Sequence, residues 1–191
     1  MEFVKAVKRP FLDLRKLLLG VLFSILPVVN FLSLGYIIGS AKSMTARRPK
    51  YDLPEWDNFW GLFVNGALGF VAILIYSLPL SLLSLMLAFY GSMSFGLGGL
   101  ALLLGLAGVL LSYLMLGGLV NFSIKGEFKS FFELRTIAEH AFTKEYFLAW
   151  LVAMLYTVVL SVALSWIPFV GEAVASFIAG LTGLTLIAEA Y

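Results

Sequence analysis

Three carboxylates lie within six residues of one another in this 191-residue chain, and they form its densest polar cluster. Asp52, Glu55 and Asp57 flank Trp56. Carboxylate oxygens are the ligands that hard divalent cations prefer, so this loop could hold a cation, bind a basic partner or serve a membrane enzyme at the interface. The ordinary alternative is that the carboxylates form weak, exposed ion pairs with the basic residues just before them, Arg47, Arg48 and Lys50. We therefore take Asp52 to Asp57 as a candidate functional loop.

The other polar groups offer little further chemistry. His140 is the only histidine, and the absence of cysteine removes thiolate metal sites and cysteine nucleophiles. Glu172 and Glu189 lie in an apolar stretch, where an acid is costly, but at its ends, where a carboxylate reaches head groups or water. No phosphate-binding loop, nucleophile elbow or zinc motif occurs. We expect no catalytic residue, metal or cofactor, and no enzymatic activity.

The basic residues define the architecture. All 13 Lys and Arg fall in three windows, 1–16, 42–60 and 122–146, and none lies between them. Only 13% of residues are charged, against about 25% in soluble domains, and 61% are hydrophobic. This composition predicts one integral membrane domain. The net charge of +2 argues against nucleic-acid binding, although the windows suit anionic lipid head groups.

The apolar stretches predict an all-α, polytopic membrane bundle of about six segments in three hairpins. The first hairpin occupies 17–41, the second 61–121 and the third 147–191. Four residues are candidate helix breaks or turns: Pro27, Asn30, Pro79 and Pro168.

The charged windows connect these hairpins. Residues 1–16 are predicted to form an amphipathic lead-in that Pro10 interrupts. Residues 42–60 are predicted to form a charged loop, and residues 122–146 an amphipathic helix that lies on the membrane surface. The uncharged turn of the second hairpin is expected near 90–95.

Residues 17–41 allow two interpretations, a single kinked span or a short hairpin that either crosses the membrane or is re-entrant. A single span would place the basic residues of the first two windows on opposite sides of the membrane, whereas a hairpin keeps all nine together. The positive-inside rule favours the hairpin. It also predicts a multi-pass protein of the cell membrane with the charged loops and both termini in the cytoplasm.

Small residues recur at helical spacing. Gly35 with Gly39, and Gly105 with Gly108, are a candidate packing face. Such a face either forms a homo-oligomer or packs helices within one bundle, and the second interpretation is the more economical.

A short internal similarity links the first and third hairpins. The sequence Ile-Leu-Pro-Val-Val-Asn of 25–30 matches Trp-Ile-Pro-Phe-Val-Gly of 166–171, and small residues follow at equal offsets. The match indicates either an internal repeat, as in many transporters, or a proline turn that any membrane hairpin favours.

Two motifs carry a resemblance to a known family. The run from Pro27 through Tyr36, followed by Leu53-Pro54-Glu55-Trp56-Asp57, resembles the prokaryotic, commonly archaeal, membrane family called domain of unknown function 4013. The matching positions are Pro27, Val29, Asn30, Gly35, Tyr36, Leu53, Pro54, Glu55, Trp56, Asp57, Leu62, Phe63 and Gly66. The resemblance implies a multi-span membrane protein and no particular activity.

The function that these features favour is a non-enzymatic module that organises the membrane or binds a partner, either a second copy or another membrane protein. The alternative is a small channel, transporter or lipid-translocating protein, because proline-broken helices can expose backbone carbonyls to a substrate path.

Overall fold

The computed structural model describes residues 2–46, 49–91 and 98–191. Its described part is helical and contains no strand. In chain order the helices are α1 (Phe3–Lys8), η1 (Arg9–Phe11), α2 (Leu14–Ile25), α3 (Asn30–Ala41), α4 (Phe59–Gly91), α5 (Gly98–Lys125), η2 (Phe128–Phe132), α6 (Leu134–Ala141), α7 (Lys144–Leu164) and α8 (Val170–Ala190). The turn expected near 90–95 lies largely outside the described residues.

Four helices are long and apolar enough to cross a membrane, namely α4, α5, α7 and α8. This composition indicates a membrane-embedded protein. At 1.5 Å per residue, the 21-residue α7 and α8 are about 32 Å long, which matches a hydrocarbon core of about 30 Å. The 33 residues of α4 extend about 50 Å, so this helix can stay within the same core only if it is steeply tilted.

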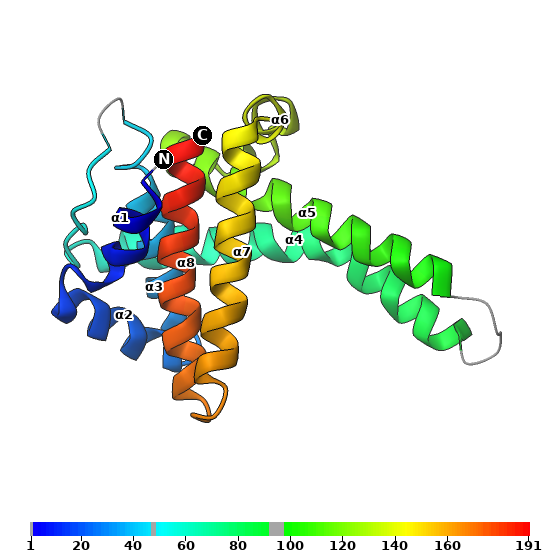
Figure 1. The fold of residues 1–191 in the computed structure, drawn as a ribbon, viewed down its shortest axis with the longest axis horizontal. Helices are drawn as coiled ribbons and strands as arrows, with labels where there is room; N and C mark the ends of the chain where they lie inside the picture. The colour runs from blue at the N-terminus through cyan, green and yellow to red at the C-terminus, as the bar shows by residue number, and fades with distance from the viewer. Residues whose placement is uncertain (1, 47–48, 92–97) are drawn as a thin grey trace.

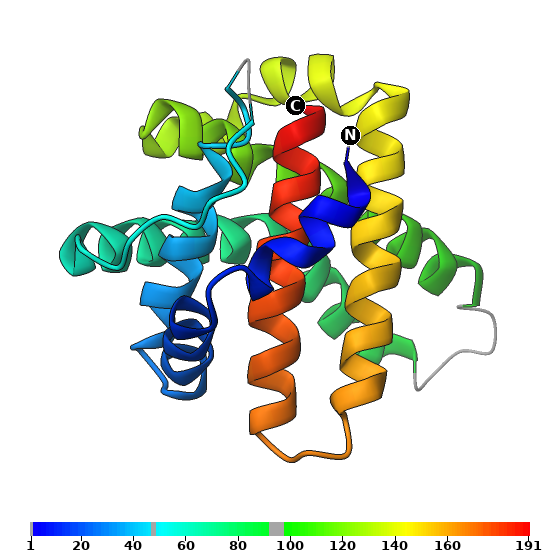
Figure 2. The same cartoon turned by 60° about the vertical axis from the view of Figure 1, so that its left-hand side comes forward.

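The four long helices do not all run in the same direction. Figures 1 and 2 show α7 and α8 side by side, with α4 and α5 running across them rather than alongside. We call the outer part of the second pair, residues 78–91 and 98–108, the arm. It extends away from the rest of the protein (Figure 1), so the second and third hairpins do not share one direction. The expected arrangement of three hairpins is therefore not confirmed.

The core is built around α8. In its most apolar window 72% of the residues are buried, against 6–11% for the other three long helices. Figure 2 shows α1 crossing in front of α8, and α2, α3, α5 and α7 also pack against it. Neighbours approach α8 closely because its sequence is rich in Ala, Gly and Thr, which leaves little side-chain bulk. Its enclosure makes α8 the element on which the other helices are positioned.

Residues 17–41 form two short helices that pack together. The hydroxyl of Ser33 donates to the carbonyl oxygen of Gly20 over 2.7 Å, although a continuous helix would separate these residues by about 20 Å. The chain therefore turns back between α2 and α3. Each helix has 12 residues, about 18 Å, which is short for a span. Their depth in a bilayer stays a prediction.

The third charged window differs from the single surface helix expected over 122–146. Residues up to Lys125 continue α5, η2 and α6 follow, and α7 begins at Lys144. Phe131 is buried and stacks on Phe122 at 4.2 Å, whereas Phe142 is 75% exposed. The expected apolar stripe is therefore divided, because part of it packs on the end of α5.

Candidate functional site

A buried arginine connects the N-terminal segment to three other parts of the chain. The Arg9 side chain is fully buried. Its Nε donates to the carbonyl oxygen of Tyr51 at 3.1 Å, and one terminal nitrogen donates to Thr185 Oγ1 at 2.6 Å. The other terminal nitrogen donates to the carbonyl oxygen of Ser40 and to Ser43 Oγ, each at 3.0 Å. We call Arg9 and these four partners the polar cap.

Neutral oxygens, rather than a carboxylate, surround this guanidinium. Within the described ranges Arg9 forms no salt bridge, and burial lowers its pKa to about 10, an effect that nearby Tyr36, Tyr51 and Asp52 partly oppose. A buried charge is tolerated only when it is extensively hydrogen-bonded. The planar fork of arginine meets that condition by reaching several acceptors at once. The polar cap therefore fixes α3, the 42–58 loop and α8 in one arrangement.

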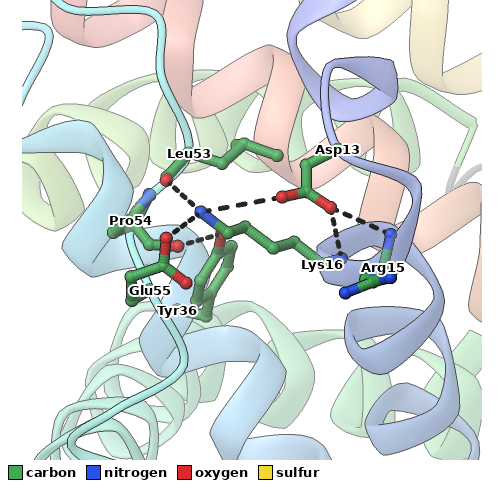
Figure 3. Close-up of polar contacts among 7 residues, drawn as sticks. All are labelled: Asp13, Arg15, Lys16, Tyr36, Leu53, Pro54 and Glu55. Carbon is green, nitrogen blue, oxygen red and sulfur yellow. Dashed lines mark hydrogen bonds and ion pairs between the residues drawn. The ribbon is translucent and has the colours of Figure 1, made fainter.

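A second contact fastens the candidate loop to α2 (Figure 3). Lys16 Nζ donates to the carbonyl oxygen of Leu53 at 2.8 Å and to Glu55 Oε1 at 2.7 Å. Asp13 caps the N-terminus of α2 by accepting from the backbone of Arg15 and Lys16, and its other oxygen lies 3.8 Å from Lys16 Nζ. Lys16 is therefore held between two acidic side chains and a loop carbonyl.

The aromatic ring of Trp56 fixes the same loop to α3. It stacks on Tyr36 with centroids 4.0 Å apart, and Phe23 of α2 meets it edge-on at 5.3 Å. The Tyr36 hydroxyl donates to the carbonyl oxygen of Pro54 at 2.9 Å (Figure 3). Trp56 Nε1 is buried without an acceptor in the described part of the chain, so stacking holds this ring.

The three carboxylates of the candidate loop do not converge. Glu55 turns to Lys16, Asp57 accepts from the backbone of Asn58 at 2.8 Å, and Asp52 is exposed. No set of three His, Cys, Asp or Glu that could hold a metal ion is found among the described residues. The predicted pairing with Arg47 and Arg48 falls outside the described residues. Within the described ranges Lys50 forms no salt bridge with these carboxylates, and the basic partner is Lys16.

Glycines let α3 and α4 cross closely. A Cβ on Gly35 would lie 1.8 Å from the carbonyl oxygen of Leu62, and a Cβ on Gly66 would lie 1.8 Å from that of Phe31. The two backbones therefore touch at this crossing, which no larger residue allows.

The other members of the candidate packing face have more space. A Cβ added to Gly39 or Gly105 would meet no atom within 4 Å, and one added to Gly108 would lie 3.5 Å from a methyl of Leu80. Of the four glycines, only Gly35 lies at a close helix crossing.

The two matching proline segments adopt the same backbone turn. The N–H of Val29 donates to the carbonyl oxygen of Pro27 at 2.8 Å, and that of Val170 to Pro168 at 2.6 Å. Val28, in the middle of the first turn, has φ 69°, and Phe169, in the second, has φ 60°. These are γ-turns with a positive central φ, which is uncommon and strained for residues other than glycine. The sequence match therefore reports a shared local geometry.

Pro79 lies inside α4 without ending it. A proline cannot donate to the carbonyl one turn earlier, so the helix needs other hydrogen bonds there. Ser77 and Ser81 each donate from the side chain to a backbone oxygen in this region, over 3.0 and 2.9 Å. Pro79 is exposed and lies where the arm begins.

A groove of about 330 Å³ lies beside the first proline turn. Its walls come from α2, α3, α4, α5 and α8, and most of the lining is apolar. Asn30, Ser24, Ser33 and Ser176 contribute the polar groups. This first groove is a place where a polar part of an otherwise apolar molecule can be accommodated.

Sequence reasoning missed Arg9 and Lys16 as organising residues. Both lie in the basic lead-in, where charge normally indicates contact with water or head groups. Their hydrogen-bond acceptors come from distant parts of the chain: Thr185 of α8 and Ser43 after α3 accept from Arg9, and Leu53 of the proline-containing loop accepts from Lys16. Only the fold brings these segments together.

Comparison with known proteins identifies a family of unknown function. A search of curated proteins and a search of solved structures each found no match. The profile of the family described as protein of unknown function (DUF4013) matches residues 18–169, from α2 through the second proline turn. This match includes the close crossing of α3 and α4 and the loop held by Lys16 and Trp56. The chain therefore belongs to the DUF4013 family.

Proposed function

We propose that this protein is a non-enzymatic membrane module that organises the bilayer around it or binds a membrane partner through the arm. The observation that carries this proposal is the position of the arm, which extends beyond the other helices (Figure 1), and the exposure of apolar side chains among its described residues. Leu85, Leu102 and Leu103 are 61–66% exposed. In a bilayer this surface meets lipid or another helix.

The arm also leaves room for a close helix contact. A Cβ added to Gly99 or Gly105 of α5 would meet nothing within 4 Å. Without a hydrophobic driving force inside lipid, helices associate where small residues let backbones approach. A second copy of the chain or another membrane protein suits this surface.

Cysteine crosslinking tests the arm directly, because the chain has no native cysteine. Leu102→Cys on the arm and Val159→Cys on the exposed side of α7 are compared in sparsely loaded vesicles. The proposal expects disulfide-linked dimers for Leu102→Cys and few for Val159→Cys, together with a change in vesicle shape on adding protein. Equal crosslinking of both variants, with unaltered vesicles, would remove the support for self-association and bilayer organisation.

We further propose that the charged segments face the cytoplasm and contact anionic lipid of the cell membrane. Lys5 and Lys129 keep side chains 59% and 76% exposed, although each also has an acidic neighbour. Basic side chains near a membrane surface gain about 1 kcal/mol each from anionic lipid. The test compares vesicles with and without anionic lipid. If the protein binds equally well and in the same orientation without anionic lipid, this part of the proposal is contradicted.

A second candidate function is transfer of lipid or another amphiphile across the bilayer. The first groove favours it, because Asn30 and three serines interrupt an apolar wall at a broken helix. Vesicles containing the protein would then exchange fluorescent lipid between leaflets faster than empty vesicles. An exchange rate equal to that of empty vesicles would exclude it.

A further inference from the structure

A second groove, of about 450 Å³, runs between α5, α7 and α8. Its floor is formed largely by small residues, among them Ala153, Ala179 and Gly183, so little side-chain volume fills it. Hydroxyls interrupt the apolar lining at Thr157, Ser161 and Ser176. The groove is separate from the arm and from the polar cap.

The groove has the length of one bilayer leaflet. On α8 its lining extends from Glu172 to Leu184, 12 helical steps that rise about 18 Å. Half of a hydrocarbon core of about 30 Å is about 15 Å. One acyl chain of a lipid, lying along the helices, therefore fits between the ends of the groove.

One end of the groove carries a negative charge. Glu172 lies in the first turn of α8 and lines the groove there. The adjoining turn exposes Trp166 and Phe169, 77% and 89%, as residues at a membrane interface commonly do. Residues 147–191 contain no Lys or Arg, and within the described chain Glu172 forms no salt bridge.

We propose that the second groove binds a membrane lipid with a primary ammonium head group, whose ammonium pairs with Glu172 while one acyl chain lies between α5, α7 and α8. Charge complementarity selects this occupant. A carboxylate at the apolar end of the protein repels anionic head groups and favours a cation that can donate hydrogen bonds. Ser161 and Ser176 line the same groove, and Ser176 Oγ, which donates to the carbonyl oxygen of Ala173, keeps lone pairs that can accept from the ammonium.

The test is competition between phosphatidylethanolamine and phosphatidylcholine with identical chains. Both heads are zwitterionic, but only the first has N–H donors. The delipidated protein is incubated with an equimolar mixture, and the lipid retained is identified and quantified by native mass spectrometry. We expect about fivefold enrichment of phosphatidylethanolamine, the factor that about 1 kcal/mol of ion pairing gives.

Two variants separate head-group from chain recognition. Glu172→Gln should retain lipid but lose the preference, whereas Glu139→Gln, on α6 and outside the groove, should keep it. Thr157→Trp should fill the groove and reduce retention of both lipids, whereas Val159→Trp, on the outer surface of α7, should not. Ser161→Leu repeats the filling test if Thr157→Trp does not fold.

Three results would overturn the proposal: equal retention of the two lipids by the wild type, a preference that survives Glu172→Gln, or unchanged retention in a folded groove-filling variant. None of these depends on the arm, so crosslinking at Leu102 is expected to be the same in Glu172→Gln. Failure of this proposal and failure of the proposed function are thus distinguishable.

Discussion

The ring of Trp56 lies flat on the ring of Tyr36, with the two planes 3° apart. Trp56 lies in the loop before α4, and Tyr36 lies in α3. Their contact, with the Tyr36 hydroxyl on Pro54, joins the 42–58 loop to α3. The loop is thereby part of the folded body of the protein, with Glu55 directed to Lys16 and Asp57 to the backbone of Asn58.

Replacing Trp56 tests this contact. Trp56→Ala removes the stack on Tyr36 and the edge contact with Phe23, and we expect a loss of about 2–3 kcal/mol, below the 3–5 kcal/mol of a fully buried ring because Trp56 is partly exposed. Thermal unfolding in detergent should show a fall in Tm of roughly 5–10 °C. Trp166→Ala, at a ring 77% exposed, is the matched control and should change Tm little. Equal effects of the two substitutions would show that the stack does not stabilise the fold.

Arg9 should tolerate even a conservative change poorly. Lysine keeps the charge, but one ammonium cannot reach acceptors on the 42–58 loop, α3 and α8 together. We expect Arg9→Lys to lower the free energy of unfolding by about 2 kcal/mol or more, since buried oxygens lose their donors. Arg15→Lys, at an exposed position of α2, is the control. A pair of variants with the same denaturation midpoint would contradict the role assigned to the polar cap.

Alanine substitutions at the two glycines of α3, Gly35 and Gly39, should have different effects on stability. Gly35→Ala places a methyl 1.8 Å from the backbone of α4 and should separate the helices, with a Tm lower by several degrees. Gly39→Ala meets no atom within 4 Å and should be neutral or stabilising by up to about 1 kcal/mol. The comparison is made by thermal unfolding of the two variants side by side. A greater loss from Gly39→Ala would mean that this face packs differently.

The two γ-turns predict stabilising substitutions. Val28 and Phe169 hold positive φ values that glycine adopts freely, and their side chains are 62% and 89% exposed. Val28→Gly and Phe169→Gly should therefore each gain about 1 kcal/mol, the relieved strain less the added entropy of the unfolded chain. Val159→Gly, inside α7, should instead lose about 1 kcal/mol. Destabilisation by all three, measured as Tm, would exclude strain at the turns.

The predictable part of the fold lies in properties that a few neighbouring residues determine. Hydropathy identifies the long helices. Pro27 and Pro168 mark the turns that join α2 to α3 and α7 to α8, because proline cannot continue a helix without losing a hydrogen bond. The small residues of α8 also carried a signal of enclosure, since a helix surrounded by others needs little bulk.

Other features depend on contacts between distant segments. The spacing of apolar residues gives the length of α4 but not its direction, which follows from its packing on α3 at Gly35 and Gly66. In the same way, Asp52, Glu55 and Asp57 are neighbours in sequence, yet the partner of Glu55 comes from α2. The clustering of these carboxylates in the sequence therefore does not predict which basic residue pairs with Glu55.

Cysteine accessibility in oriented membranes tests the central claim, that the charged segments gather on one side of the bilayer. Contacts from Glu2 to Glu189 and from His140 to Tyr191 join the first and third windows to the C-terminus, and Lys5 over the ring of Tyr51 joins the first window to the second. Single cysteines at Lys5, Ala46 and Lys129 report on the three windows, and one at Ser165 reports on the turn between α7 and α8. We expect the first three to react with an impermeant maleimide from the cytoplasmic side and Ser165→Cys from the other. Labelling of Lys5→Cys and Ala46→Cys from opposite sides would contradict the account, because their segments could not then form the polar cap.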